Sequence, residues 1–409
     1  MNVALRRLIA SVDNGVWGSE PGESQLDVRC IRAADFDFPG LRVDMSHAPL
    51  RGVDRASFVR LALRRGDIVL EKSGGGDSTP VGRAVAYEND QPAVTSNFAA
   101  RVRAAAGVDP RFLVYLLQSL YTSGITLKCI KQTTGIQNLD TAHWLESRVE
   151  RPESGEQRRI ADFLDDRIAR IDRIITSRRT QIHLLSTWVA SAVEGAFSPE
   201  VSPGRWLRVK DVASKVGSGK TPRGGADAYV AEGVTFLRSQ NVHNDGLRLD
   251  DVAFISPETD QEMSGTRVMA GDVLLNITGG SLGRCCVTDA TALPANVSQH
   301  VCIIRPHAIE PRNLALVLRS RIVQDQIRLA QAGGNRDGLN FEQVRELRFW
   351  HPEDSSVWSR CRSLEARWSR GLGITGRTVS SLTEYKQSLI TAAVTGELDV
   401  TTAGSGIPG

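Results

Sequence analysis

One stretch of the sequence occurs twice, as GDIVLEKSGGGDSTPVGR at residues 66–83 and as GDVLLNITGGSLGR at residues 271–284. Further blocks repeat in the same order, at an offset that stays between about 200 and 205 residues. They are PAVTSN at 92–97 with PANVSQ at 294–299, NLDTAHWLESRVERPE at 138–153 with GLNFEQVRELRFWHPE at 338–353, and AVEGAF at 192–197 with AVTGEL at 393–398. The 409 residues therefore form two copies of one unit.

Each copy has a mixed region of strands and helices, followed by a long helical segment without proline. In the mixed regions, DPRFLVYLLQSL at 109–120 corresponds to EPRNLALVLRSR at 310–321, and both predict helices that begin at proline. The first long helix carries apolar residues in alternating steps of four and three, which is the heptad pattern of a coiled coil. These seam residues are Leu164, Ile168, Ile171, Ile175, Ile182, Leu185 and Val189.

The second long helix keeps a weaker seam, with Leu372, Val379, Leu382 and Leu389. Glycines at 371, 373 and 376 each cost about 1 kcal/mol inside a helix, so the sequence leaves open whether this helix is continuous. If the two helices pair antiparallel, the two modules stand at opposite ends of a rod and are related by an approximate two-fold axis.

These patterns predict an α+β fold with two pseudo-symmetric α/β globular modules separated by two long antiparallel coiled-coil helices. The predicted parts are a first module over 1–152, a central helix over 153–198, a second module over 199–352, a C-terminal helix over 353–400 and a flexible tail over 401–409.

Composition excludes several classes of protein. Hydrophobic residues make up 41% and charged residues 24%, as in ordinary globular chains, and the net charge of +3 excludes a uniformly basic surface. The sequence has no apolar run of about 18 residues and no signal peptide, so we expect a cytoplasmic protein without membrane contact. The six cysteines form no CxxC pair, which argues against a zinc site or a disulfide framework.

The strongest catalytic motif is GSGKT at 217–221, which is similar to the end of a phosphate-binding loop. Ser214 stands where the first glycine of that loop is needed, however, and Pro222 follows where a helix should begin. A nuclease site at Asp67 and Glu71 is also disfavoured, because the second copy has Asn276 in place of the glutamate. We therefore expect no catalytic residue and no metal site in this chain.

Several of these segments carry a family resemblance. From about Leu5 to Val400 the sequence resembles the specificity subunit of type I restriction-modification enzymes. The matching elements are the two copies of the GD block, FLRSQNV at 236–242, PANVSQHVCIIRP at 294–306, GEQRRIADFLDDRIARIDRII at 155–175 and AVTGELDV at 393–400. The sequence departs from the family at 355–376, where SSVWSRCRSLEARWSRGLGITG replaces the second EQ-x-x-IA run.

The resemblance implies two target-recognition domains, each reading one half of a bipartite double-stranded DNA target. It also implies that the helices set the spacing of the half-sites and dock two modification subunits. Those partners would bind S-adenosylmethionine, and restriction subunits using ATP and Mg would translocate and cleave DNA, so this chain would hold no cofactor. The alternatives are a coiled-coil adaptor that binds no specific DNA and, on GSGKT alone, a nucleotide-dependent enzyme.

Candidate DNA contacts follow from residue chemistry, because lysine and arginine bind phosphates while arginine, amide and hydroxyl side chains read base edges. In the first module they are Lys72, Ser73, Arg83, Lys128, Lys131, Gln132 and Asn138. In the second they are Ser218, Lys220, Thr221, Arg223, Arg238, Asn241, Asn276, Arg284, Asn335 and Arg336. Arg83 and Arg284 recur in both copies, which also fits a structural role. Modules that read different half-sites should differ in their loops, as residues 128–137 and 328–338 do.

Overall fold

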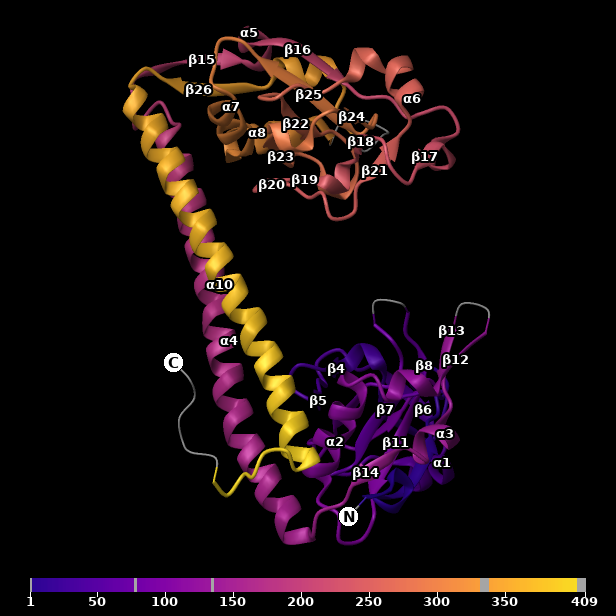
Figure 1. The fold of residues 1–409 in the computed structure, drawn as a ribbon. Coiled ribbons are helices and arrows are strands. Elements are labelled where there is room, and N and C mark those ends of the chain that lie inside the picture. Colours follow the sequence, from indigo (N-terminus) through magenta and orange to yellow (C-terminus); the bar gives the residue numbers. More distant parts are fainter. Residues whose placement is uncertain (1, 77–78, 134–135, 332–337, 403–409) are drawn as a thin grey trace. The chain divides into compact units, whose positions relative to one another are not determined.

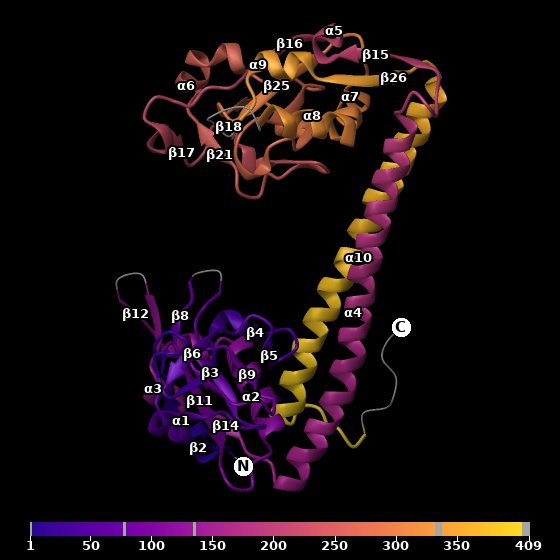
Figure 2. The ribbon, with the colours of Figure 1, turned by 180° about the vertical axis from the view of Figure 1, so that it is seen from behind.

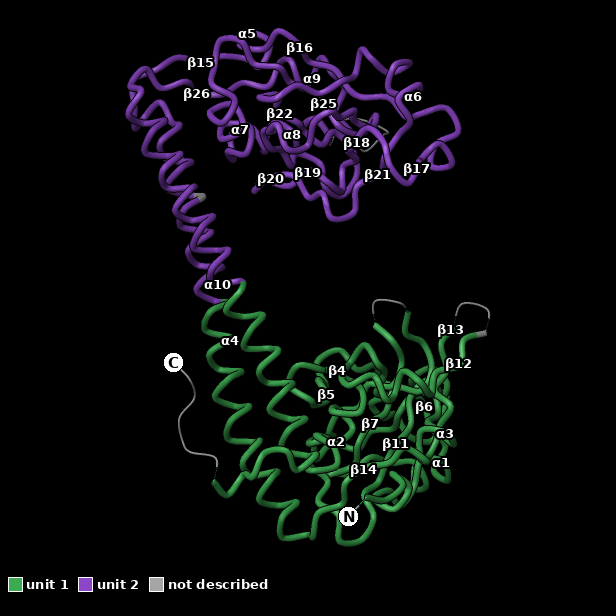
Figure 3. Tube along the Cα trace, in the orientation of Figure 1, with its two compact units in different colours: residues 1–179, 377–409 green, residues 180–376 purple. Residues whose placement is uncertain are grey.

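The computed structural model describes residues 2–76, 79–133, 136–331 and 338–402. Its contacts divide the chain into two compact units, which are residues 1–179 with 377–409 (unit 1) and residues 180–376 (unit 2) (Figure 3). Two long helices, α4 (Ser154–Ala196) and α10 (Ser355–Thr395), each contribute one half to each unit (Figure 1). We call the part of unit 1 that precedes α4 module 1, and the part of unit 2 between α4 and α10 module 2. The predicted domain boundaries stay a prediction.

Module 1 is built around a six-stranded sheet in the order β2-β11-β7-β9-β5-β4. Its strands are β2 (Ile9–Asn14), β4 (Phe36–Asp37), β5 (Arg42–Val43), β7 (Ile68–Glu71), β9 (Ala84–Ala86) and β11 (Ala99–Ala104). Smaller sheets are β10-β3-β6, β12-β13-β8 and β1-β14. Their strands are β1 (Asn2–Ala4), β3 (Leu26–Ile31), β6 (Leu50–Val53), β8 (Ser73–Gly74), β10 (Ala93–Thr95), β12 (Ile130–Thr133), β13 (Ile136–Leu139) and β14 (Arg148–Glu150). The helices are α1 (Arg55–Leu61), α2 (Pro110–Thr122) and α3 (Thr141–Leu145).

Module 2 has sheets in the orders β16-β25-β22-β23, β17-β21-β18-β24, β15-β26 and β19-β20. Its strands are β15 (Gly204–Arg208), β16 (Ala213–Ser218), β17 (Tyr229–Val230), β18 (Val234–Leu237), β19 (Val242–His243), β20 (Gly246–Leu247), β21 (Ala253–Ile255), β22 (Val273–Asn276), β23 (Cys285–Val287), β24 (Ala295–Val297), β25 (Val301–Pro306) and β26 (Arg348–Pro352). Its helices are α5 (Val209–Val212), α6 (Pro257–Glu262), α7 (Pro311–Arg319), α8 (Arg321–Gln331) and α9 (Phe341–Glu346).

The two modules, which Figure 2 shows from behind, repeat one topology in their strand pairing. The strand order β2-β11-β7-β9 of module 1 recurs as β16-β25-β22-β23 in module 2. The parallel pair of β10 and β3 recurs as β24 and β18, and the antiparallel pair of β1 and β14 recurs as β15 and β26. Both proline-started helices form, with Asp109 and Glu310 as N-caps. The predicted α+β fold with two pseudo-symmetric modules is confirmed.

The repeated GD dipeptide is a turn in both modules. Gly66 and Gly271 have φ angles of 91° and 86°, a left-handed conformation that side chains other than glycine rarely adopt. The backbone N–H groups of these glycines donate to the carbonyls of Tyr87 and Thr288, which directly follow β9 and β23. The glycine at this position is therefore required by the backbone and not by a ligand.

The aspartate of each GD turn is a buried structural anion. Arg103 Nε lies 2.9 Å from Asp67 Oδ1, and Arg305 Nε lies 2.8 Å from Asp272 Oδ1. These hydrogen bonds raise the pKa of both arginines. Each carboxylate forms an ion pair with an arginine of the sheet. The aspartate of the GD pair therefore has a structural role and is not part of a metal site.

Within unit 1, the first half of α4 packs antiparallel against the last turns of α10. Leu164 and Ile171 share a buried core with Leu389 and Ile390. Lys386 of α10 is almost fully buried, and its Nζ donates to the Asp172 carboxylate at 2.7 Å and to the Pro39 carbonyl at 2.7 Å. The predicted seam of Leu164, Ile168, Ile171 and Ile175 is buried throughout, and Val379 and Leu382 pack against it.

Within unit 2, the last turns of α4 pack against the start of α10, and the Phe197 and Trp358 rings lie 4.8 Å apart. Val189 is buried and Ile182 and Leu372 are half-buried, but Leu185 is 41% exposed, so its predicted place in the seam is wrong. The part of α10 that lies in unit 2 ends near its glycines at 371, 373 and 376. Glycines offer few side-chain atoms to cover a leucine.

Helix α10 is continuous over Ser355–Thr395, which answers the question that its glycines left open. Residues 371, 373 and 376 all lie inside it. The Thr375 hydroxyl donates to the Gly371 carbonyl at 2.9 Å within this stretch. The propensity cost of the glycines is therefore outweighed by the packing of the turns on either side.

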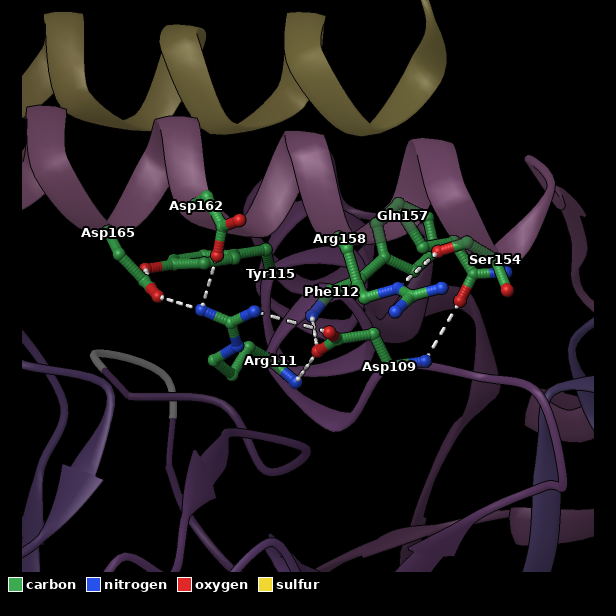
Figure 4. A network of polar contacts seen from close by, with 9 residues as sticks. All are labelled: Asp109, Arg111, Phe112, Tyr115, Ser154, Gln157, Arg158, Asp162 and Asp165. Atoms are coloured by element: carbon green, nitrogen blue, oxygen red, sulfur yellow. Dashed lines mark hydrogen bonds and ion pairs between the residues drawn. The ribbon is translucent and has the colours of Figure 1, made fainter.

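Module 1 is fastened to α4 by a network of polar contacts (Figure 4). Arg111 of α2 lies 2.8 Å from the Asp162 carboxylate and 2.7 Å from the Asp165 carboxylate of α4. The buried Gln157 side chain accepts the Asp109 N–H at 2.9 Å, and the Tyr115 hydroxyl donates to Asp165 at 2.7 Å. Residues of the EQ-x-x-IA-x-FLD segment thus hold the module on its helix.

Module 2 is fastened by different side chains. Arg362 of α10 donates to Asn313 at 2.5 Å and to the Glu310 carboxylate at 3.3 Å, both at the start of α7. Arg319 at the end of α7 is 2.8 Å from Glu365 of α10. Here the long helix supplies an arginine where α4 supplies aspartates. The sequence departure at 355–376 therefore reverses the polarity of the contact at the start of α7 through Arg362, whereas Glu365 keeps a carboxylate on the long helix.

Candidate nucleic-acid interface

In module 1, the small sheet β12-β13-β8 brings predicted residues together (Figure 1). Its register places Lys131 opposite Asn138, and Asn138 opposite Ser73. The Ser73 hydroxyl donates to Asn138 Oδ1 at 2.6 Å. Lys131 is exposed and 2.6 Å from Asp140, whose pKa it lowers by that hydrogen bond. A cation, an amide and a hydroxyl therefore form one row across the sheet.

Lys72 lies between β7 and β8 and joins the same edge. Its Nζ donates to Asn14 Oδ1 at 2.5 Å, and its backbone N–H donates to the Phe98 carbonyl at 2.9 Å. The Ser73 N–H donates to the same carbonyl at 3.0 Å. The turn between β10 and β11 is thereby held against β8. Asn97 and Phe98 at its tip are exposed, although the sequence singled out neither.

We call this exposed edge the rim of module 1. It consists of Asn14, Lys72, Ser73, Asn97, Phe98, Lys131 and Asn138. Gln132 is exposed but follows Lys131 on β12, so its side chain points to the opposite face of the sheet. Lys128 is exposed on a short 3₁₀ helix over Thr126–Cys129.

Arg83 lies deeper in module 1, and its side chain is already paired with that of Glu71. Its guanidinium makes two hydrogen bonds with the Glu71 carboxylate, at 2.8 and 3.1 Å. The Glu71 side chain is only 3% exposed, and these bonds raise the pKa of Arg83. A buried carboxylate without its partner is costly, so this arginine compensates Glu71 inside the fold.

In module 2, Ser218, Lys220 and Thr221 leave the end of β16 and run into a loop that contains Arg223. Lys220, Thr221 and Arg223 are exposed. The nearest helical segment is a four-residue 3₁₀ helix over Gly225–Ala228, so no helix opens after the Lys-Thr pair to cradle phosphates. This geometry does not support the phosphate-binding-loop alternative.

Two predicted DNA contacts of module 2 are corrected by the structure. Asn241 is 2% exposed, and its amide donates to the carbonyls of Arg248 and Asp251. Asn276 is 0% exposed, and its amide donates to the Ser239 carbonyl at 2.8 Å. Polar residues read from a sequence look available to a ligand, but these two satisfy backbone groups inside the module.

The remaining candidates of module 2 are differently placed. Arg238 is half-buried, and its guanidinium donates to the Asp251 carbonyl at 3.1 Å. Arg284 is exposed and lines a cleft of about 1490 Å³ within unit 2, together with Arg312 and Trp368. Asn335 and Arg336 lie outside the described residues.

Module 2 has the same turn beside the end of its β22 strand. The Ile277 N–H donates to the His300 carbonyl at 3.0 Å, as Lys72 does to Phe98. Gln299 and His300 are exposed at the tip, and the Thr278 hydroxyl lies 2.7 Å from His300 Nδ1. We call Ser218, Lys220, Thr221, Thr278, Gln299 and His300 the rim of module 2.

No family model and no curated protein matches the chain. One solved structure, which addresses complex assembly and conformational transition of the type I R-M system, contains a chain similar in fold to this one. The match covers 97% of this chain and 98% of that chain, with a TM-score of 0.65 and 15% sequence identity. The chain resembles type I restriction-modification S subunits in its fold. The S subunit from M. genitalium and the HsdS subunit from Thermoanaerobacter tengcongensis also match, with TM-scores of 0.46 and 0.45, identities of 13% and 15%, and coverage of 96% and 97% of each chain.

The two rims present amides, hydroxyls and cations, which are groups that can contact base edges and phosphates. Across the described ranges, histidine, cysteine, aspartate and glutamate side chains nowhere gather in threes as a metal site would require. In the same ranges, helices long and apolar enough to cross a membrane are absent.

Proposed function

We propose that the chain is the DNA-specificity subunit of a type I restriction-modification system. Each module binds one half of a bipartite double-stranded DNA target, and α4 and α10 set the spacing and dock two modification subunits. One observation carries this proposal: the two modules share a buried frame and differ at the exposed rim.

The shared frame is seen in matched buried interactions. The Asp67–Arg103 pair of module 1 corresponds to Asp272–Arg305 of module 2. The peptide N–H groups of Leu139 and Leu339 donate to the equivalent carbonyls of Lys72 and Ile277. Two modules with this common frame present equivalent edges to their ligands.

The rims differ at equivalent positions. Phe98 corresponds to His300, because both accept the same backbone hydrogen bond. The donor of that bond is Lys72 in module 1 and Ile277 in module 2, where the isoleucine is buried and adds no side chain to the rim. Ser73 corresponds to Thr278, which forms the matching bridge in module 2. A protein that reads two different half-sites needs one frame and two sets of base contacts.

Partner docking is proposed for the exposed apolar face of α4 in unit 2. Leu184, Leu185 and Trp188 are all exposed there, and a cluster of large apolar side chains on a surface is typical of a protein contact. Modification subunits at the helices would supply S-adenosylmethionine and the methylation chemistry. Restriction subunits would supply ATP- and Mg-dependent translocation and cleavage, so this chain needs no cofactor.

Co-expression with an adenine-specific modification subunit from the native genome tests the proposal. We expect a stable complex and, in methylome sequencing, a methylated motif with two short half-sites and a spacer of constant length. A stable complex that methylates no bipartite motif and binds all duplexes equally would support the adaptor alternative instead. Omission of the chain is the control, and it should abolish the methylated motif.

A further inference from the structure

We infer that the turn between β10 and β11 of module 1, and its counterpart between β24 and β25 of module 2, are base-reading elements. Their tip residues, Asn97 with Phe98 and Gln299 with His300, would determine which bases each half-site contains. This inference rests on the proposed function and names the residues that carry out its specificity.

Both turns have the same buried base. The Ala99 N–H donates to the Ser96 carbonyl at 3.0 Å, and the Val301 N–H donates to the Ser298 carbonyl at 3.1 Å. Ser96 and Ser298 are buried, and in the described part of the chain the hydroxyl of each has no hydrogen-bond partner. The first and last residues of the turn therefore belong to the frame.

A neighbouring glycine holds each turn in place. A Cβ atom on Gly15 would lie 2.1 Å from the Thr95 carbonyl oxygen, and one on Gly219 would lie 1.7 Å from the Val297 carbonyl oxygen. Such distances are far below van der Waals contact, so only glycine permits this close approach. The matched glycines place Asn14 and Ser218 directly beside the turns, and both residues belong to the rims.

In each turn the two tip residues are exposed, and the second of them changes its chemistry between the modules, from Phe98 to His300. Phe98 is 50% exposed, within a rim whose other side chains are polar. Its ring offers an apolar face for stacking on a base or for contact with a thymine methyl group. Asn97 and Gln299 are the side chains that pair bidentately with adenine.

His300 is the counterpart of Phe98 but has a different chemistry. Its ring is oriented by Thr278, whose hydroxyl lies 2.7 Å from Nδ1. A positioned imidazole forms directional hydrogen bonds with a base edge, whereas a phenyl ring does not. The two turns are therefore suited to read different bases from the same position in the frame.

An exchange of turns tests this inference in the complex with the modification subunit. The variant N97Q/F98H places the tip of module 2 on module 1. We expect altered or relaxed base preference in the half-site read by module 1, and an unchanged second half-site and spacer, in methylome sequencing. The reciprocal variant Q299N/H300F should change the other half-site only.

Binding measurements add a single-residue test. Phe98→Ala should weaken binding to the specific duplex about tenfold and leave non-specific duplex binding unchanged, because loss of one base contact is expected. Val59→Ala on α1 is the matched control, since Val59 is also an exposed apolar residue of module 1 and lies outside the rim. Equal melting temperatures of variants and wild type show that the fold is retained.

The outcomes separate the two proposals. If the wild-type complex methylates a bipartite motif and both turn variants methylate that same motif, the inference about the turns is overturned and the proposed function stands. If the wild-type complex methylates no bipartite motif, the proposed function fails and the inference fails with it.

Discussion

Modules 1 and 2 share matched buried ion pairs but differ at the exposed tips of equivalent turns. Asp67 with Arg103 and Asp272 with Arg305 are interchangeable pairs, each with a buried carboxylate. At the rim, the carbonyl that accepts the equivalent backbone hydrogen bond belongs to Phe98 in module 1 and to His300 in module 2. The difference teaches that packing constrains the frame of this fold, whereas the rim diverges without cost to it.

The two units also differ in how the long helices pack. In unit 1 the seam is closed, with Ile171 fully buried and Lys386 bound to Asp172. In unit 2 Leu185 and Trp188 of α4 are exposed. The same heptad pattern of α4 is therefore buried in unit 1 and partly exposed in unit 2, because the residues of α10 that face it differ.

The largest effect is expected where this contrast between the halves of α4 is strongest. Ile171→Asp places a carboxylate in the core of unit 1 and should lower its free energy of unfolding by about 4 kcal/mol or more. Leu185→Asp, at the matching heptad position in unit 2, should cost less than about 1 kcal/mol, because the residue is already exposed. Urea unfolding of the full chain measures both. Equal losses would contradict the difference between the halves.

A smaller effect is expected from breaking the shared frame. Arg103→Ala and Arg305→Ala each leave a buried aspartate without its partner, at a cost of about 3 kcal/mol in either module. Arg65→Ala is the control, because Arg65 and its partner Asp90 are both exposed and the change should cost at most about 1 kcal/mol. Thermal and urea unfolding report the losses. Destabilisation in one module alone would show that the two frames are not equivalent.

The smallest effect is expected from a single cation of the rim. Lys220→Ala removes one exposed charge from module 2, so the slope of log Kobs against log salt for DNA binding should fall by about 0.9 if Lys220 contacts a phosphate. Lys210→Ala should leave the slope unchanged, since Lys210 is paired with Glu346. An ATP titration of the wild type should show no binding. ATP binding that Lys220→Ala abolishes would revive the nucleotide-binding alternative.

The sequence misjudged residues whose burial and hydrogen-bond partners are set by the folded module. Asn241 and Asn276 are polar, and nothing in their own stretches shows that they bond to the carbonyls of Arg248 and Ser239 inside the module. Phe98 is the opposite case, since an aromatic residue between two buried strands is expected in a core. Its exposure follows from the hydrogen bonds that hold its turn against Lys72.

The sequence by itself determined the duplication with its repeated GD block, the proline-started helices and most of the heptad seam. Each of these depends on residue order over a few turns or on a repeat along the chain, which are local properties. Only the tertiary structure decided that Leu185 is exposed, that Arg83 serves Glu71, and that the tip residues join the rim. Burial and pairing arise between segments far apart in the chain, so no local pattern contains them.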